Sequence, residues 1–117
     1  MATINRVLPP TFLEQLAQIR AELQELDIVL RGSITKRFMP CGTQGCRCQA
    51  DPPQLHGPYY QWTTKVRGKT QTVRLKPEEV ADFERWVAQG RRLEQLVQQW
   101  RTESLDAAKI IHEKLPR

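Results

Sequence analysis

The sequence predicts an α+β fold in which a long, coiled-coil-like helical hairpin carries a small inserted β-hairpin head. Three observations favour this fold. Apolar residues recur at helical spacing in both terminal parts, the middle part is rich in aromatic, threonine and valine residues around a short turn, and all three cysteines lie in the middle part. At 117 residues, the chain is predicted to form a single domain. We assign residues 11–31 to a helix, 32–76 to a basic β module, and 77–115 to one helix or more.

The N-terminal helix is predicted from an apolar stripe and two end signals. Thr11 and Glu14 have the spacing of a capping box, in which each side chain binds a free backbone amide at the helix start. Gly32 suits the left-handed conformation that ends many helices. Between these signals, leucines recur at intervals of three, four and seven: Leu13, Leu16, Leu23, Leu26 and Leu30.

The C-terminal helix is predicted to start at Pro77, which suits the first helical position, and Glu78 and Glu79 favour the positive end of the helix dipole. Ser104 is a candidate cap for a separate last helix that ends before Pro116. Four residues at intervals of seven form a coiled-coil-like seam: Trp86, Leu93, Trp100 and Ala107. Because the first helix is too short to cover the second stripe, we expect the helices to form a homo-oligomer, most simply a symmetric dimer.

Two strands in the middle of the chain are predicted to form a hairpin around the two-residue turn Arg67-Gly68. The strands are Tyr59–Val66 and Lys69–Leu75, and Ser33–Met39 is a candidate for a third, short strand. The turn fixes the register, with the pairs Val66 and Lys69, Thr64 and Gln71, Trp62 and Val73, and Tyr60 and Leu75. These four pairs share one face of the hairpin, which is apolar at the end far from the turn and is expected to pack on the helices. The opposite face is polar and basic and carries Tyr59, Gln61, Thr63, Lys65, Thr70, Thr72 and Arg74.

Four potential metal ligands, Cys41, Cys46, Cys48 and His56, occur in the pattern C-x4-C-x-C-x7-H. Zinc prefers four thiolate and imidazole ligands in a tetrahedron, so this Cys3His set predicts a structural zinc ion that stabilises the β head. An extended backbone from Cys46 to Cys48 would direct both sulfurs to one side. Two alternatives stay open: cysteines that only pack or stay free, and redox chemistry or another soft metal.

Positive charge is concentrated in the same module. Residues 31–76 contain nine Lys or Arg against one acid, Asp51, whereas the whole chain carries a net charge of +5. A basic module with interleaved aromatic residues favours an anionic partner, and we expect nucleic acid, DNA rather than RNA. A solvated surface with charged strand edges is the structural alternative. The candidate nucleic-acid contacts are Arg31, Lys36, Arg37, Arg47, Tyr59, Gln61, Lys65, Arg67, Lys69, Arg74 and Lys76.

The sequence does not favour an enzyme. Hydrolysis and phosphoryl transfer need grouped carboxylates or an open metal site with a general base, and residues 31–76 offer only Asp51. No P-loop, serine-hydrolase elbow or dinucleotide fingerprint occurs. Cys48 and His56 could act as nucleophile and base, but no orienting carboxylate accompanies them. His112, the other histidine, lies on a polar stretch and is expected at the surface.

Four strings of the middle module resemble a family of small uncharacterised prokaryotic proteins. The strings are Arg31-Gly32-Ser33, Cys41-Gly42 with Gly45-Cys46-Arg47-Cys48, His56-Gly57-Pro58-Tyr59-Tyr60, and Gly68-Lys69-Thr70. The resemblance covers residues 31–86 and implies a basic, cysteine-containing domain of unknown function, associated with mobile-element and transposase genes. It also implies a common ligand cluster at the three cysteines and His56, and it names no substrate.

The N-terminal residues Met1–Pro10 lack the apolar core of a secretory signal, and no run of 18 apolar residues follows. Together with the odd number of cysteines, these features predict a cytoplasmic protein without a membrane segment. The leading hypothesis is a non-enzymatic, zinc-stabilised nucleic-acid-binding protein, a mobile-element accessory or regulatory factor. Two other functions stay open: a protein-interaction module that recruits a partner through the helical stripes, and a thiol redox protein.

Overall fold

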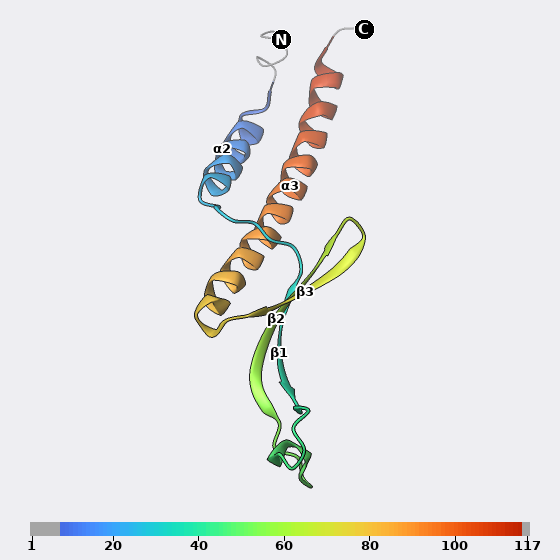
Figure 1. Cartoon of the computed structure of the whole chain (residues 1–117). Coiled ribbons are helices and arrows are strands. Elements are labelled where there is room, and N and C mark those ends of the chain that lie inside the picture. The colour runs from blue at the N-terminus through green and yellow to red at the C-terminus, as the bar shows by residue number, and fades with distance from the viewer. Residues whose placement is uncertain (1–7, 116–117) are drawn as a thin grey trace. The chain divides into compact units, whose positions relative to one another are not determined.

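The computed structural model describes residues 8–115 of the chain and confirms the α+β class. Within these residues, one α-helix precedes a three-stranded antiparallel sheet and another follows it (Figure 1). Two short 3-10 turns also occur, η1 between the first two strands and η2 before the second helix. The elements are α2 (Pro10–Gln24), β1 (Ser33–Met39), η1 (Arg47–Gln49), β2 (His56–Val66), β3 (Lys69–Leu75), η2 (Pro77–Glu79) and α3 (Val80–Lys114).

The described chain divides into two compact units, which we treat separately. The sheet unit comprises Leu30–Ala88 and holds the sheet, the cysteine-containing loop and the first residues of α3. The helix unit comprises the described residues up to Val29, with α2, and those from Gln89 onward, with the rest of α3. Each unit buries apolar residues of its own: Leu75 and Val87 in the sheet unit, and Ile19, Leu96 and Ala107 in the helix unit.

β2 is the central strand of the sheet, with β1 on one side and β3 on the other (Figure 1). The hairpin register predicted from the Arg67-Gly68 turn is confirmed at all four predicted pairs. Arg67 and Gly68 both have positive φ, 53° and 79°, as a type I′ turn requires. The candidate third strand is also confirmed, because β1 covers Ser33–Met39 and pairs antiparallel with β2.

The apolar face of the sheet packs against the first turns of α3 within the sheet unit. The ring centroids of Trp62 and Phe83 lie 5.6 Å apart, and those of Phe83 and Trp86 lie 5.1 Å apart, both at the tilted angles that aromatic rings prefer. The Trp62 indole N–H donates to the carbonyl of Arg31 at 2.9 Å. The Leu30 amide donates to the carbonyl of Trp86 at 3.1 Å. These contacts fix the segment that enters β1 against both β2 and α3.

The prediction that Gly32 ends the first helix is wrong, because α2 ends at Gln24. Gly32 instead allows two backbone segments of the sheet unit to approach closely. Its φ is +111°, which a residue with a side chain rarely adopts. A Cβ atom at this position would lie 2.2 Å from the carbonyl oxygen of Thr63 on β2. Both the backbone conformation and the lack of space therefore require glycine here.

The predicted helix start, Pro77, is the first residue of the 3-10 turn η2, which leads directly into α3 at Val80. The Glu79 carboxylate accepts a hydrogen bond, at 2.9 Å, from the backbone amide three residues earlier, which satisfies a free N–H group at the helix start. The separate last helix predicted from Ser104 is wrong, because α3 runs unbroken to Lys114. Serine is tolerated inside a helix, and no proline or glycine interrupts this second half of α3. Pro116, the predicted boundary, lies outside the described residues.

α2 differs from the predicted helix at both ends. It starts at Pro10, so Thr11 lies inside the helix, no side chain caps it, and the predicted capping box is wrong. It ends at Gln24 instead of residue 31. The predicted long, coiled-coil-like helical hairpin is therefore also wrong, since α2 has 15 residues against 35 in α3 and the two helices make few contacts. Among residues 8–115, no helix combines the length and apolar composition needed to cross a bilayer.

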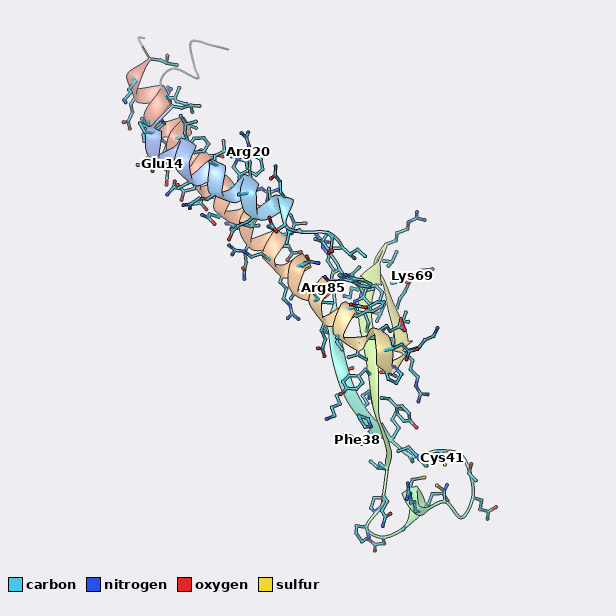
Figure 2. The ribbon with its side chains drawn as sticks, turned by 90° about the vertical axis from the view of Figure 1, so that its left-hand side faces the viewer. Glu14, Arg20, Phe38, Cys41, Lys69 and Arg85 are labelled. Atoms are coloured by element: carbon cyan, nitrogen blue, oxygen red, sulfur yellow. The ribbon has the colours of Figure 1, made fainter. Side chains whose placement is uncertain are left out.

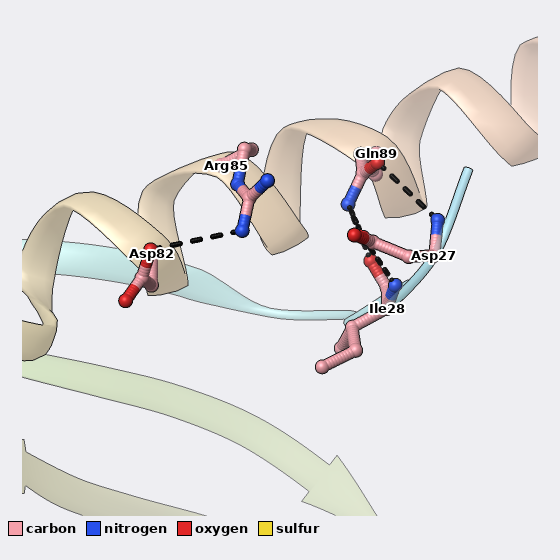
Figure 3. Close-up of polar contacts among 5 residues, drawn as sticks. All are labelled: Asp27, Ile28, Asp82, Arg85 and Gln89. Atoms are coloured by element: carbon pink, nitrogen blue, oxygen red, sulfur yellow. Dashed lines mark hydrogen bonds and ion pairs between the residues drawn. The ribbon is translucent and has the colours of Figure 1, made fainter. Parts of the chain in front are cut away.

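One side chain of α3, Gln89, accounts for the early end of α2 (Figure 3). Its Nε2 donates to Asp27 Oδ1 at 2.6 Å and to the carbonyl of Ile28 at 2.9 Å. The Asp27 carboxylate also accepts from the Ile28 amide at 2.6 Å. Such side-chain bonds compete with helical ones, so the backbone of this segment finds its partners outside a helix. A second contact within the helix unit joins α3 to α2: Arg92 donates to both carboxylate oxygens of Glu22 at 2.6 and 2.7 Å. Because this ion pair is exposed, it contributes at most about 1 kcal/mol to stability.

Replacing Gly32 by Ala is expected to destabilise the sheet unit by about 2 kcal/mol or more, since the new Cβ meets the Thr63 carbonyl and the backbone is strained. Thermal unfolding monitored by tryptophan fluorescence measures this, because Trp62 and Trp86 both lie in the sheet unit. Gly42→Ala is the matched control, as its Cβ would meet no atom within 4 Å. Equal melting temperatures for the two variants would show that the close approach at Gly32 is not required.

Candidate metal centre and polar sheet face

The loop of residues 40–55, which we call the metal loop, starts and ends at neighbouring positions of the sheet. Met39, the last residue of β1, pairs with His56, the first residue of β2, after a register irregularity that begins at Arg37. Cys41 follows two residues beyond this pair, so strand pairing brings the first and last potential ligands to the same end of the sheet. Figure 2 shows Cys41 in the loop beyond that end.

The four predicted ligands converge. Their ligand atoms all lie within 4.8 Å of one another. The sulfurs of Cys41 and Cys48 are 3.6 Å apart, and the Cys46 sulfur lies 3.2 Å from His56 Nε2. Tetrahedral bonds of about 2.3 Å to sulfur and 2.0 Å to nitrogen separate neighbouring ligand atoms by roughly 3.5–3.8 Å. The cluster therefore suits a metal ion such as zinc.

Backbone and amide hydrogen bonds shape the metal loop around the ligands. The predicted extended path from Cys46 to Cys48 is wrong: the backbone turns into η1 directly after Cys46, and the Gln49 amide donates to the Cys46 carbonyl at 2.9 Å. The Gln49 side chain donates to the carbonyl of Thr43 at 3.1 Å, across the loop. The turn moves Cys48 inward, where it is only 2% exposed, and the Cys41 amide donates to its sulfur at 3.3 Å.

The thiols of the cluster are not equivalent electrostatically. The backbone amide and then the hydroxyl of Thr43 lower the pKa of Cys41 to about 6, with smaller effects from the neighbouring thiols. For Cys48, the bond from the Cys41 amide lowers the pKa, but burial and the thiols of Cys41 and Cys46 raise it more, so that its net pKa is raised. Cys41 is thus a thiolate at neutral pH, the form that binds a metal.

With four protein ligands, the cluster can hold a metal ion without an open coordination position. That arrangement is typical of structural zinc sites, whereas catalytic sites keep a position for water or substrate. Cys41, Cys46 and His56 are half-buried and Cys48 is buried. The chemistry that the site supports is therefore cross-linking of the metal loop to the end of the sheet.

The sheet register defines a second feature, the polar sheet face, on the side opposite Trp62 and α3. Because paired residues point to the same side, each strand contributes alternate residues. The guanidinium of Arg74 lies 3.7 Å from the ring centroid of Tyr59, and the Thr63 and Thr72 hydroxyls are 3.3 Å apart. The face consists of Ser33, Thr35 and Arg37 from β1, Tyr59, Gln61, Thr63 and Lys65 from β2, and Thr70, Thr72 and Arg74 from β3.

The structure brings some of the eleven predicted nucleic-acid contacts together and separates others. Five share the polar sheet face: Arg37, Tyr59, Gln61, Lys65 and Arg74. Two lie on the opposite face, because Lys36 pairs with Tyr60 and Lys69 pairs with Val66. The other four lie outside the strands: Arg31 before β1, Arg47 in the metal loop, Arg67 in the hairpin turn and Lys76 after β3.

The sequence analysis predicted Arg37 of β1 as a contact but missed the other two β1 residues of this surface, Ser33 and Thr35. Thr35 and Ser33 extend the row of hydroxyls to a third strand, and Arg37 Nη1 donates to Gln61 Oε1 at 3.5 Å. The alternation of Lys36 and Arg37 along an extended strand was the available signal, since neighbouring residues must point to opposite faces. Lys36 instead lies 5.7 Å from the Phe38 ring centroid on its own face.

Comparison with protein families finds one match, over residues 11–85, to a domain of unknown function, DUF6788. The match covers α2, the whole sheet and the start of α3, and so begins earlier than the resemblance noted in the sequence. No curated protein matches the chain, and no solved structure does.

We expect the purified full-length protein to contain one zinc ion per chain, measured by elemental analysis. Loss of a residue that only hydrogen-bonds to a metal ligand weakens metal binding by up to about 100-fold. His56 is itself a predicted ligand, so His56→Ala should weaken zinc binding by more than that. His112→Ala is the control, because His112 lies exposed on α3, outside the cluster. A protein that purifies without metal and melts at the same temperature with and without a chelator would disprove the site.

Proposed function

The chain belongs to the DUF6788 family, whose description assigns no activity, and we propose from its own residues that it is a non-enzymatic, zinc-stabilised nucleic-acid-binding protein. The observation that carries the proposal is the polar sheet face, where Arg37, Lys65 and Arg74 lie among hydroxyl groups. Strands β1, β2 and β3 contain no Asp or Glu at all. A cationic surface without carboxylates suits a polyanion, since nothing on it repels phosphate.

Each group on the face has a distinct role in this proposal. Arg37, Lys65 and Arg74 neutralise phosphates, and the threonine hydroxyls donate to phosphate or sugar oxygens. Tyr59 offers an aromatic ring beside these cations for a base or sugar, although Arg74 already covers one side of it. The zinc ion acts at a distance, because it holds the metal loop against the end of β1 and β2 and so keeps the sheet rigid.

Duplex DNA is the partner that we favour. Beyond the pair of Ser33 with Thr63, the β2–β3 hairpin continues as a two-stranded ribbon to the Arg67-Gly68 turn. A two-stranded ribbon fits the major groove of B-DNA, whereas the deep, narrow major groove of A-form RNA excludes it. The ribbon also carries Lys65 on the polar sheet face and Arg67 in its turn, and both are exposed. A role as an accessory or regulatory factor of a mobile element, which the sequence resemblance implies, is compatible with such binding.

An enzymatic function is not part of the proposal. The polar sheet face has neither a histidine nor a carboxylate to act as general base, and the only carboxylate of the sheet unit before β3 is Asp51, in the metal loop. A thiol redox role would need free, reactive thiols. The zinc content of the protein decides between that role and a metal-bound cluster.

We also propose that the helix unit mediates association with a second copy of the chain. A surface groove of about 570 Å³ on α3 is lined by Val97, Trp100 and Leu105 together with the polar residues Arg101 and Ser104, and residue Leu105 is 57% exposed. Neighbouring apolar side chains that are exposed in a single chain often form a surface that a partner covers. In a symmetric dimer, the groove of one copy would cover the same groove of the other. The alternative is that a different protein covers this groove.

Binding of a fluorescent DNA duplex, measured by anisotropy between about 50 and 200 mM salt, tests the nucleic-acid proposal. With about five phosphate contacts, the slope of log affinity against log salt should be near −4 to −5. Replacing both Arg37 and Arg74 by Gln should flatten the slope by about two units and weaken binding at every sequence.

The matched control is the double variant Lys36→Gln with Lys69→Gln, which removes the same charge from the opposite face of the same sheet. It should bind almost as well as the wild-type protein. If both double variants lose affinity equally, net charge rather than the polar sheet face determines binding. If the wild-type protein does not bind duplex DNA at all, the proposed function is wrong.

Sedimentation velocity at micromolar concentration tests the association of the helix units. We expect a dimer for the wild-type protein and a monomer for Leu105→Glu, because a charge in the groove prevents its burial. Leu13→Glu is the control, since Leu13 is a comparably exposed leucine on α2, outside the groove. A monomeric wild-type protein, or equal dissociation of both variants, would contradict the proposed interface.

A further inference from the structure

One edge of β2 in the sheet unit has no strand partner. β1 begins at Ser33, opposite Thr63, whereas the hairpin of β2 and β3 continues from Thr64 to the turn. A groove of about 350 Å³, which we call the edge groove, lies at this end of the sheet. It is lined by Arg31, Gly32, Thr63, Thr64, Lys65 and Thr70.

The lining of the edge groove has the chemistry of an anion site. It contains two cations and three hydroxyl-bearing side chains, and none of its residues is acidic. Lys65 pairs with Thr70, so the ammonium and the hydroxyl stand on the same side of the ribbon. Arg31 lies two residues before the pair of Ser33 with Thr63 and lines the groove from the segment that precedes β1. Positive groups therefore approach the groove from two different chain segments.

The backbone adds a donor. In a hairpin with a two-residue turn, the residues that flank the turn exchange their backbone hydrogen bonds with each other. Those residues are Val66 and Lys69, so alternation directs the amide of Lys65 away from β3. The Lys65 N–H thus points to the open edge of β2, on the side of the edge groove. An amide, an ammonium and a hydroxyl together match the several acceptor oxygens of a phosphate group.

The wall opposite β2 is held in place. The Trp62 indole N–H binds the carbonyl of Arg31 at 2.9 Å, and Gly32 lies so close to β2 that a Cβ would be 2.2 Å from the Thr63 carbonyl. The Arg31 and Gly32 backbone is thereby fixed by contacts with Trp62 and Thr63 of β2. Fixed walls reduce the ordering cost of binding a small ligand.

We propose that the edge groove binds one phosphate group of a nucleic-acid backbone, with Lys65, Arg31 and the Thr70 hydroxyl as its contacts. This inference rests on the proposed function and assigns it a defined phosphate position. A free phosphate ion has the same chemistry, and the two sources are separated experimentally. The bound phosphate would anchor the two-stranded ribbon and leave Arg37 and Arg74 to contact neighbouring phosphates along the sheet.

The first experiment titrates the zinc-loaded full-length protein with inorganic phosphate at constant ionic strength and follows backbone amide resonances by NMR. We expect saturable shifts of the Gly32, Lys65 and Thr70 amides, and none with chloride. Lys65→Gln and Thr70→Val should each weaken the phosphate affinity roughly 10-fold or more, the usual effect of losing a charged or charge-assisted hydrogen bond. Lys69→Gln is the charge-matched control, because it pairs with Val66 on the opposite face.

The second experiment measures duplex DNA binding of the same three variants, after circular dichroism and zinc analysis have established that each is folded and metal-loaded. Weaker binding of Lys65→Gln and Thr70→Val, with near wild-type binding of Lys69→Gln, supports the proposal. If DNA binds and depends on Arg37 and Arg74, but phosphate leaves the groove amides unshifted and Lys65→Gln behaves like Lys69→Gln, the proposal is overturned while the proposed function stands. If phosphate binds in the groove but DNA does not bind, the source is free phosphate, and the nucleic-acid assignment of the groove fails together with the proposed function.

Discussion

The structure of the sheet unit depends on the position of one strand, β2, between β1 and β3. Its residues alternate between two roles: Trp62 and Thr64 face the side that packs against α3, and Tyr59, Gln61 and Thr63 face the polar side. Its first residue, His56, is also the last ligand of the metal cluster. A slip of one residue in the pairing would turn the polar row toward the core and move His56 away from the cysteines. Core, surface and metal cluster are thus fixed by a single register.

The metal loop complements a small core. In the sheet unit, few apolar side chains are fully buried, and Phe38, Met39 and Leu55, which border the loop or lie next to it, stay exposed. Burial alone gives such a unit limited stability. A metal ion that joins the three cysteines of the loop to His56 on β2 would add stability without further apolar residues. The lowered pKa of Cys41 favours metal binding, because a thiol that has already lost its proton need not release one when the metal binds. Folding of the loop and binding of the metal are therefore expected to be one event.

The sequence predicted the hairpin and the ligand cluster, whereas two local predictions, the capping box at Thr11 and the extended path from Cys46 to Cys48, were wrong, as were features that depend on long-range contacts. The hairpin register was predictable because a two-residue turn determines it. The ligand set was predictable because thiols and an imidazole at short spacing are the usual donors of a structural zinc site. The end of α2 was not predictable, since it depends on hydrogen bonds between Asp27 and Gln89, far apart in the sequence. The role of Gly32 was also not predictable. Local rules place a glycine at the end of a helix, whereas Gly32 allows the backbone to pass close to the Thr63 carbonyl, far away in the sequence.

The alternation along β2 has a consequence for how this protein can diverge in evolution. Substitutions at Tyr59, Gln61 or Thr63 change the outward surface, while Trp62 and its contacts with Arg31 and Phe83 keep the backbone in place. The outward surface can therefore change without loss of the fold, and the metal cluster at the far end of the strand is unaffected by such changes. Relatives with the same four ligands and different outward residues would then share this backbone and differ in the chemistry of one face.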